Sequence, residues 1–326
     1  MSRRPTLSIV VPVRDDRVRL GRCLASIAQS AGSRDIEVIV VDNGSTDGSA
    51  DVASAAGARV LSMPGVRVSE ARNAGASAAR ADLLAFVDAD HTLDAEWIPA
   101  VLEILSNPAV GGAGAPYLTQ PDANWIQRAY GRLRPRIVGQ QVVDWLGSGN
   151  LIVRKSAFTA IGGFDTVLES CEDVDLCNRL GIGGFRLVAD ERLRSVHWGD
   201  PRTLRALFFG ELWRGRDNIK VTLRGHLTLG ALPSLLIPIV NLTCICLLLG
   251  SPWLGAGMAL GAALAPASLS IAKALRMSCR QASCTPVQLL QNVVVSLVYD
   301  MARACALVFR ATHKTRRETA GERAVA

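Results

Sequence analysis

The first 90 residues alternate between short apolar runs and amphipathic segments. Continuous β-branched or apolar runs, which are typical of strands buried on both faces, occupy residues 7–13, 36–41 and 82–87. Helical spacing of apolar residues covers residues 17–31, and the Ala-rich residues 69–80 predict a further helix. Strands that alternate with helices in this way predict an α/β fold, with a mostly parallel sheet and helices on both of its faces.

The region up to residue 200 continues less regularly. Residues 147–153 and 185–189 are predicted to form strands. Residues 171–180 begin as a helix whose first turn is acidic, a placement that the helix dipole favours. We therefore expect residues 1–200 to form one catalytic domain.

Two long apolar runs follow this domain. Residues 227–250 contain no charged residue in 24 positions, and residues 253–272 contain none in 20. Each run is long enough to cross a hydrocarbon core of about 30 Å as a helix. The alternative is a pair of buried core helices, but the length of the uninterrupted runs favours membrane spans. Their close spacing predicts a transmembrane helical hairpin over residues 227–272. Gly257 and Gly261 are expected to form its close-packed face.

The net charge of +7 is concentrated beside these apolar runs. The flanking basic residues are Arg205, Arg214, Arg216, Lys220, Arg224, Lys273, Arg276 and Arg280. This distribution is typical of cytoplasmic flanks that contact anionic lipid head groups, and no nucleic-acid-binding motif accompanies it. We expect residues 201–226 to be an interfacial basic segment. The two apolar runs predict a multi-pass protein of the cytoplasmic membrane. Because the N-terminus has no long apolar signal region, we expect the catalytic domain to stay in the cytoplasm.

The last segment, residues 273–326, is expected to comprise a basic loop, a membrane-associated helix and a basic tail. Residues 287–309 are apolar but carry Asn292, Asp300 and Arg303 among other polar residues. This pattern predicts a helix that lies along the inner membrane face. The alternative is a third span whose polar groups face the hairpin.

Several polar residues at predicted strand or helix ends could carry chemistry. Asp88-Ala89-Asp90 directly follows a predicted strand, and ligands of open α/β sheets bind at the carboxyl ends of strands. Two carboxylates in this position can hold a divalent cation, Mg²⁺ or Mn²⁺, together with substrate phosphates. The alternative is a pair of solvated acids in a turn.

Other candidates allow both a functional and a structural interpretation. Asp42 can accept a hydrogen bond from a base or ribose, or it can form an Asx turn. Arg72 can pair with a diphosphate, or it can be a solvated helical arginine. Glu172 and Asp173 can supply a general base near an acceptor, or they can cap their helix. His197 is either a metal ligand or a loop residue.

Taken in order, these segments resemble the family 2 glycosyltransferases, the inverting enzymes with the GT-A fold. The resemblance covers most of residues 7–200. The segments that carry it are SIVVPVRDD (8–16), VIVVDNGSTDGS (38–49), ARNAG (71–75), LLAFVDAD (83–90), GSGNLIVRKSAFTAIGGFD (147–165) and CEDVDLCNRL (171–180).

The resemblance implies a role for each matching residue. The residues implied to bind the nucleotide or the donor sugar are Pro12, Val13, Asp15, Asp42, Arg72 and Asp88. Asp90 is implied to bind the metal on the diphosphate, with His197 as a further ligand, and Asp173 is implied to be the catalytic base. The acceptor side would be formed by Glu172, Gly149 and Asn150.

The expected function is therefore inverting, metal-dependent transfer of a single sugar at the cytoplasmic membrane face. The donor would be a nucleotide-diphosphate sugar, and the acceptor a lipid-linked or cell-envelope glycan. A single transfer is favoured because the Q-x-x-R-W motif of processive synthases is absent. The first-strand motif departs from the family pattern, since Arg14-Asp15-Asp16-Arg17 replaces its usual Asn-Arg ending. The alternatives are a polyprenyl-phosphate sugar synthase, a sugar nucleotidyltransferase and a non-catalytic membrane scaffold.

Overall fold

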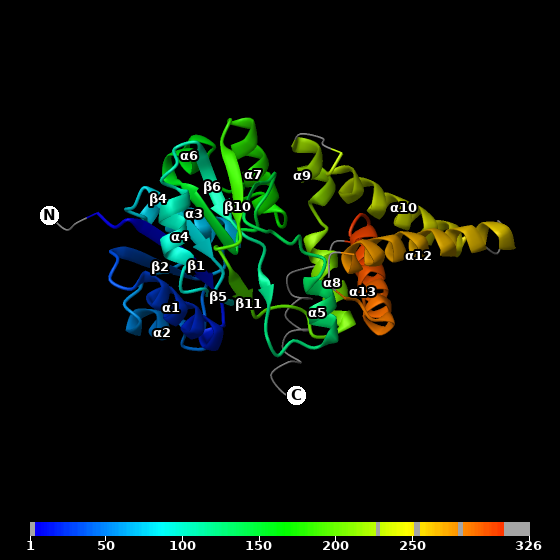
Figure 1. Cartoon of the computed structure of the whole chain (residues 1–326), viewed down its shortest axis with the longest axis horizontal. Helices are drawn as coiled ribbons and strands as arrows, with labels where there is room; N and C mark the ends of the chain where they lie inside the picture. Colours follow the sequence, from blue (N-terminus) through cyan, green and yellow to red (C-terminus); the bar gives the residue numbers. More distant parts are fainter. Residues whose placement is uncertain (1–3, 226–228, 251–254, 280–282, 310–326) are drawn as a thin grey trace. The chain divides into compact units, whose positions relative to one another are not determined.

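The structure is a computed structural model of the chain that describes residues 4–225, 229–250, 255–279 and 283–309 (Figure 1). The chain divides into two compact units. Unit 1 comprises Met1–Gln120 and Arg136–Gly199, and unit 2 comprises Pro121–Pro135 and Asp200–Ala326. Unit 1 ends at Gly199, so most of the segment expected to form the catalytic domain lies in this unit. The assignment of residues 121–135 to unit 2 differs from the expectation that residues 1–200 form one domain.

An eight-stranded sheet in the order β3-β2-β1-β4-β9-β6-β10-β8 forms the centre of unit 1. Its strands are β1 (Leu7–Val13), β2 (Ile36–Asp42), β3 (Arg59–Ser62), β4 (Leu83–Val87), β6 (Val110–Gly114), β8 (Gln140–Val142), β9 (Asn150–Arg154) and β10 (Arg186–Asp190). The first four strands of the chain run parallel, as does the β6–β10 pair. β9 and β8 run antiparallel to their neighbours. The predicted mostly parallel sheet is therefore confirmed, with β9 reversed within it.

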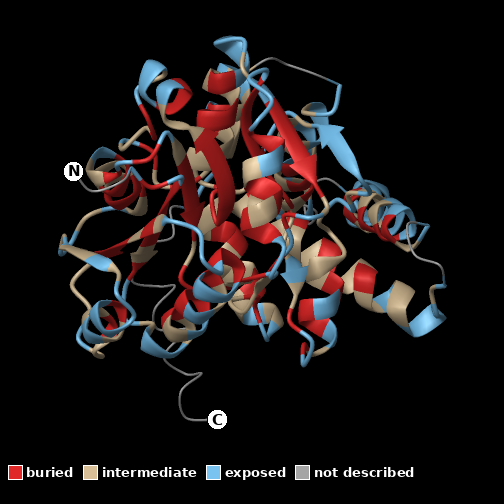
Figure 2. Cartoon of the chain, turned by 60° about the vertical axis from the view of Figure 1, so that its left-hand side comes forward, coloured by how far each residue is buried: buried red, intermediate tan, exposed pale blue. Residues whose placement is uncertain are grey.

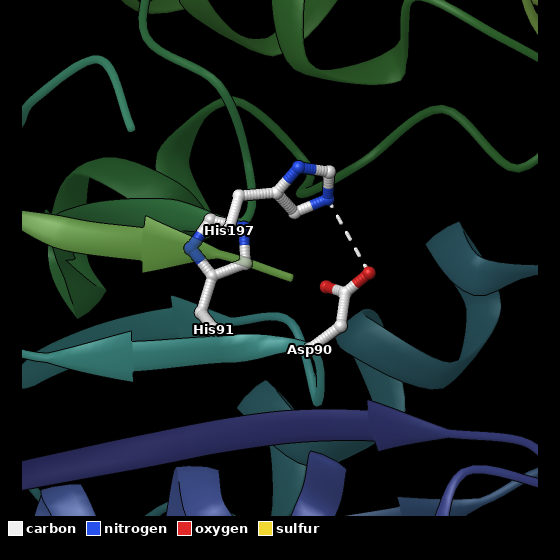
Figure 3. A group of neighbouring side chains, drawn as sticks. All are labelled: Asp90, His91 and His197. Carbon is white, nitrogen blue, oxygen red and sulfur yellow. Dashed lines mark ion pairs between the residues drawn. The ribbon is translucent and has the colours of Figure 1, made fainter. Parts of the chain in front are cut away.

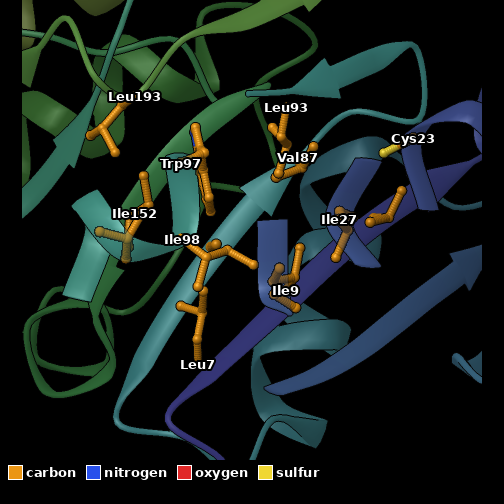
Figure 4. Packing of buried hydrophobic residues seen from close by; sticks show 14 of the residues in the cluster. Leu7, Ile9, Cys23, Ile27, Val87, Leu93, Trp97, Ile98, Ile152 and Leu193 are labelled. Atoms are coloured by element: carbon orange, nitrogen blue, oxygen red, sulfur yellow. The ribbon is translucent and has the colours of Figure 1, made fainter. Parts of the chain in front are cut away.

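Helices cover both faces of this sheet, as predicted (Figure 1). Alternate residues of a strand point to opposite faces, so β1 contributes Leu7, Ile9 and Val11 to one hydrophobic cluster and Val10 to the other. The first cluster, part of which Figure 4 shows, includes side chains of α1 (Arg17–Ala31), α2 (Ser49–Ala55) and α4 (Trp97–Ile104). The second includes side chains of α3 (Val68–Ala78), α6 (Lys155–Ala160) and α7 (Glu172–Ile182). Packing on both sides leaves the central strands buried (Figure 2).

A second, three-stranded sheet follows the carboxyl end of β4. It consists of β5 (His91–Leu93), β11 (Ser195–His197) and β7 (Leu118–Thr119), in the order β5-β11-β7. Antiparallel pairing of β5 with β11 places His197 opposite His91. The reversal of β9 places Asn150, its first residue, opposite Val87, the last residue of β4. These two pairings bring three distant parts of the sequence to the end of β4.

Unit 2 is helical in its described residues. Its helices are α5 (Trp125–Gly131), α8 (Leu204–Arg214), α9 (Asn218–Arg224), α10 (Leu232–Leu249), α12 (Ala256–Ser278) and α13 (Pro286–Cys305). Among the described helices, α10 and α12 are long and apolar enough to cross a membrane, and only 17% and 22% of their most apolar windows are buried. They match the two predicted apolar helices. The turn predicted between them, at residues 251–252, lies outside the described residues.

The packed face of α12 differs from the predicted one. No atom of the described residues lies within 4 Å of a Cβ built on Gly257 or Gly261, so the prediction that these glycines form the packed face is wrong. The buried residues of α12 instead follow one another every three or four positions: Ala262, Pro266, Ser270, Ala274 and Met277. A stripe of mostly small residues does pack, but it begins after the two glycines.

The predicted helix over residues 287–309 is present as α13. A capping box starts it, because the Thr285 hydroxyl accepts from Gln288 N–H and the Gln288 side chain accepts from Thr285 N–H. The polar side chains of α13 face the other helices of unit 2, as the 2.8 Å pair between Lys273 of α12 and Asp300 illustrates. Its position along the membrane face stays a prediction.

Candidate active site

The loops after β1 and β2 interlock at the carboxyl edge of the sheet. Asp15 has a left-handed backbone (φ 49°), and its N–H donates to Ser45 Oγ at 2.9 Å. Its carboxylate accepts from Thr46 N–H at 2.8 Å. Asp42 is buried, and its carboxylate accepts a hydrogen bond from Ser45 N–H at 3.2 Å. This bond is the one expected if Asp42 forms an Asx turn. Both predicted nucleotide-binding carboxylates therefore lie at one edge and also shape its loops.

The other two residues predicted for the nucleotide pocket end β1. Val13 is buried, and its carbonyl accepts from Asn43 N–H at 2.9 Å. Pro12 is half-buried and pairs in register with Val41 of β2. The end of β1 therefore lies beside the loops that contain Asp15 and Asp42.

A carboxylate and two imidazoles converge beyond the end of β4 (Figure 3). One ligand atom from each of Asp90, His91 and His197 lies within 4.8 Å of the other two. Asp90 Oδ2 is 3.3 Å from His197 Nε2. His91 is buried, and its Nδ1 is 3.1 Å from Ser195 Oγ. The predicted pairing of Asp90 with His197 is present, and His91 is an additional member.

Neighbouring basic side chains keep Asp90 ionised. Burial by itself raises the pKa of this carboxyl, but His197, His91 and Arg19 outweigh it and hold the pKa well below its usual range. Arg19 Nη1 lies 3.8 Å from Asp90 Oδ2, and the same guanidinium pairs with Asp16 at 2.7 Å. A carboxylate in this state is ready to bind a cation.

Two glycines leave room around this cluster. A Cβ built on Gly149 would lie 2.8 Å from Asp88 Oδ2 and 3.0 Å from His91 Nε2. A Cβ on Gly199 would lie 2.9 Å from His197 Nε2 and would also crowd Asp90 Oδ2. The oxygen and imidazole nitrogen donors suit Mn²⁺, whereas Mg²⁺ prefers oxygen ligands alone. The residues present thus fit a divalent cation.

Arg72 connects the end of β4 to the start of α7. Its side chain is only 3% exposed, and its guanidinium pairs with Asp88 Oδ1 at 2.7 Å and with Glu172 Oε1 at 2.8 Å. Burial opposes its charge, yet Asp88 and Glu172 together raise the pKa of Arg72 above its usual range. Its Nε atom has no hydrogen-bond partner among the described residues. The arginine predicted to contact the nucleotide therefore joins the carboxylate of Asp88, after β4, to that of Glu172, at the start of α7.

Asp173 has the environment of a general base. Its carboxylate accepts from Val174 N–H at 2.8 Å and from Ser148 N–H at 3.4 Å. Burial, followed by the negative charge of Glu172, raises the pKa of Asp173 to about 6. A carboxyl group with a pKa near 6 can exchange a proton close to neutral pH.

Asn150 departs from its expected acceptor-side role. The residue is fully buried, and its Oδ1 accepts from Trp97 Nε1 at 2.8 Å. Its Nδ2 donates to the carbonyl oxygens of Ala115 and Leu193 at 3.1 and 2.7 Å. Because these bonds occupy the amide, Asn150 holds the frame of the site and is corrected from an acceptor contact to a structural residue.

His91 and Arg19 were missed in the sequence analysis. His91 directly follows Asp90, so the tetrapeptide Asp-Ala-Asp-His was a signal that could have drawn attention to it. Arg19 offered no such signal. It lies in the first turn of α1, and only the fold brings that turn within reach of Asp90.

Residues 8–161 match the sequence profile of glycosyl transferase family 2. This span contains β1 to α6, the Asp88-Ala89-Asp90 segment and Arg72. Residues 8–161 belong to glycosyltransferase family 2. The family resemblance of the sequence segments is thereby confirmed.

Two curated relatives illustrate the similarity within this family. The pre-mycofactocin glycosyltransferase of Mycobacterium tuberculosis is 30% identical over 194 residues, which cover 56% of this chain and 40% of the relative. The validoxylamine A glucosyltransferase of Streptomyces hygroscopicus is 36% identical over 248 residues, which cover 62% of this chain and 57% of the relative. The chain therefore matches about half the length of these curated relatives.

Solved structures establish the fold. The mannosyltransferase PcManGT from Pyrobaculum calidifontis, solved with GDP-Man and Mn²⁺, superposes with a TM-score of 0.63 at 17% identity, over 93% of this chain and 88% of that one. TarS 1-349 from S. aureus, solved with UDP-GlcNAc, gives a TM-score of 0.50 at 15% identity, over 68% of each chain. Unit 1 has the GT-A fold of these glycosyltransferases.

Proposed function

We propose that this chain transfers a single sugar, with inversion, from a nucleotide-diphosphate sugar to an acceptor hydroxyl. The observation that best supports this function is the pair of unlike carboxylates at one edge of the GT-A sheet. Asp90 is kept ionised beside two imidazoles, whereas Asp173 has a pKa of about 6. The sugar nucleotides GDP-Man and UDP-GlcNAc, in complex with which similar proteins were solved, support the donor class.

The donor side would be formed by the loops after β1, β2 and β4. Asp15 and Asp42 line the edge at which a nucleotide would lie, and Asp88 would face the ribose or the donor sugar. Asp90, His91 and His197 would hold a divalent cation, which when bound neutralises the charge of the leaving diphosphate. The mixed oxygen and nitrogen donors favour Mn²⁺ over Mg²⁺ in this position.

The acceptor side would use Asp173 as the general base. Its carboxylate takes the proton of the acceptor hydroxyl while that oxygen attacks the anomeric carbon, on the face opposite the leaving diphosphate. Attack from that face inverts the anomeric configuration. The backbone N–H groups of Ser148 and Val174 orient the carboxylate, and Glu172 lies next to it on α7.

Unit 2 would place this chemistry at the cytoplasmic membrane face. The exposed apolar surfaces of α10 and α12 support a membrane-spanning hairpin, and α13 would lie along the inner face. A lipid-linked or cell-envelope glycan is the acceptor class that this location favours. A cysteine added after Ala326 tests the position of α13: protection from a membrane-impermeant reagent in intact cells is expected, and labelling would indicate a third span.

A donor screen tests the proposed activity. Membranes that contain the full chain are incubated with a panel of nucleotide-diphosphate sugars and Mn²⁺, and release of the nucleoside diphosphate is measured. We expect one donor class to give release that chelation abolishes, and nuclear magnetic resonance of the product to give the inverted anomer. Release without sugar transfer, or a retained anomer, would contradict the proposed mechanism.

A further inference from the structure

Unit 2 contains an arginine whose charge no carboxylate balances among the described residues. Arg132 follows α5, and its Nε donates to Asn292 Oδ1 at 2.8 Å. Its Nη2 atom is buried and has no hydrogen-bond partner within the part of the chain that the structure describes. A buried guanidinium nitrogen without an acceptor costs free energy. A ligand that supplies the acceptor would recover that cost.

Three other arginines of this unit show how a carboxylate can balance such a charge. Arg134 pairs with Asp200, while Arg214 and Arg303 pair with Glu211 at 2.8 and 2.9 Å. Among the described residues, the side chain of Arg132 has a hydrogen bond only to the neutral amide of Asn292. Burial, and the nearby charge of Arg128, lower the pKa of Arg132 from its ordinary value. A bound anion would therefore stabilise the charged form of Arg132.

A chain of hydrogen bonds places this guanidinium near the end of an apolar helix. Asn292 is fully buried, and its Nδ2 donates to Ser278 Oγ at 3.2 Å. Ser278 is the last residue of α12, one of the two candidate membrane spans. The ends of a span lie at the level of the lipid head groups. Two hydrogen bonds, through Asn292, therefore connect Arg132 to Ser278, which would lie at the level of the lipid head groups.

We propose that Arg132, assisted by the exposed Arg128, binds the phosphate group of a membrane lipid. A planar guanidinium donates two parallel hydrogen bonds to phosphate oxygens, and the amide of Asn292 fixes its orientation through Nε. This inference rests on the membrane association of unit 2 in the proposed function, but not on sugar transfer. The phosphate could belong to a phospholipid or to a polyprenyl phosphate, which share this chemistry.

Binding can be measured on the full-length protein in detergent without any sugar nucleotide. The thermal unfolding midpoint is followed while dihexanoyl phosphatidic acid, farnesyl phosphate or inorganic phosphate is titrated, with dihexanoylglycerol as the phosphate-free lipid. Both lipid phosphates should stabilise the wild-type protein, and the tighter of the two identifies the source. Arg132→Gln should weaken this binding roughly tenfold or more, the usual worth of a charge-assisted hydrogen bond.

Two further variants make the result interpretable. Arg128→Gln should weaken binding less, and because Arg128 is exposed, this variant serves as the test if Arg132→Gln does not fold. Arg202→Gln, which removes another exposed arginine of unit 2, should leave binding unchanged. Equal binding by wild type and both Arg132 and Arg128 variants would overturn the proposal, as would equal affinity for inorganic phosphate. An inactive transferase that still binds lipid phosphate would contradict the proposed function alone.

Discussion

The segment after β4 and the first turn of α7 each carry a half-buried aspartate, and the pKa values of the two carboxyl groups are shifted in opposite directions. Asp90 has imidazoles and a guanidinium as neighbours, so its pKa is held well below the usual range. Burial and the negative charge of Glu172 disfavour the ionised form of Asp173, so its pKa rises to about 6. Identical side chains thereby acquire unlike chemistry from their neighbours. The first suits cation binding and the second suits proton transfer.

Arg72 limits the difference between these two regions, because its charge lowers the pKa of Asp173. Its one buried guanidinium pairs with Asp88 after β4 and with Glu172 of α7. Without it, Asp88 and Glu172 would lose the guanidinium that they share, and Asp173 would lose a nearby positive charge. The contrast between Asp90 and Asp173 is therefore a property of the edge as a whole, and substitutions on either side should change it in predictable directions.

Removal of the Asp90 charge should have the largest effect. Asp90→Asn leaves two imidazoles without their carboxylate, so cation binding and stabilisation of the leaving diphosphate should be lost together. We expect turnover to fall by roughly 10²–10³-fold, since such stabilisation is worth several kcal/mol. Turnover is measured over a range of Mn²⁺ concentrations. Asp94→Asn, at an exposed aspartate just after β5, is the matched control and should be fully active.

Removal of the proposed base should have the next largest effect. Asp173→Asn should lower kcat by about 10²-fold, the usual worth of a positioned base, with little change in the KM of the donor. Steady-state kinetics and nucleotide titration separate the two effects. A variant that turns over normally, or that loses nucleotide binding instead, would assign the base to another residue.

Local sequence patterns predicted most of the fold because each element in unit 1 satisfies its own periodicity. The strand over residues 7–13 and the helix over residues 17–31 were predicted with the boundaries that the structure gives. The direction of β9 could not be predicted in this way, because an apolar run buried on both faces has the same composition in either direction. Only its partners, β4 and β6, determine its orientation.

The candidate site was predictable where residues follow a strand and was not where the fold assembles them. Asp88 and Asp90 were found because they end a buried run, and Asp173 because it opens a helix. Asn150 was misassigned because the sequence does not reveal that its amide bonds to Trp97, Ala115 and Leu193. The same limit applies to the packed face of α12, since periodicity does not identify which stripe of small residues meets another helix.

The space around the donor edge offers a smaller test. Gly149→Ala would bring a methyl group against Asp88 Oδ2 and His91 Nε2, so the cluster must shift by a few tenths of an ångström. We expect turnover to fall about tenfold, because catalysis is sensitive to small displacements. The Mn²⁺ concentration that gives half-maximal turnover should rise, because the displaced cluster would bind the ion less tightly. Gly181→Ala, on the exposed side of α7 with open space around it, is the control and should keep full activity.

The smallest effect should appear only in the pH profile. Asp173 acts as a base when ionised, so wild-type kcat should decline as the pH falls through about 6. Glu172→Gln removes the neighbouring negative charge and should move this acid limb to lower pH, with little effect on kcat at pH 8. Arg72→Gln removes the compensating positive charge and should move the limb to higher pH. The midpoint of the acid limb is obtained from kcat measured between pH 5 and pH 9. Shifts of this midpoint in opposite directions in the two variants would show that the limb reports the ionisation of Asp173. The same midpoint in all three proteins would show that another group is responsible.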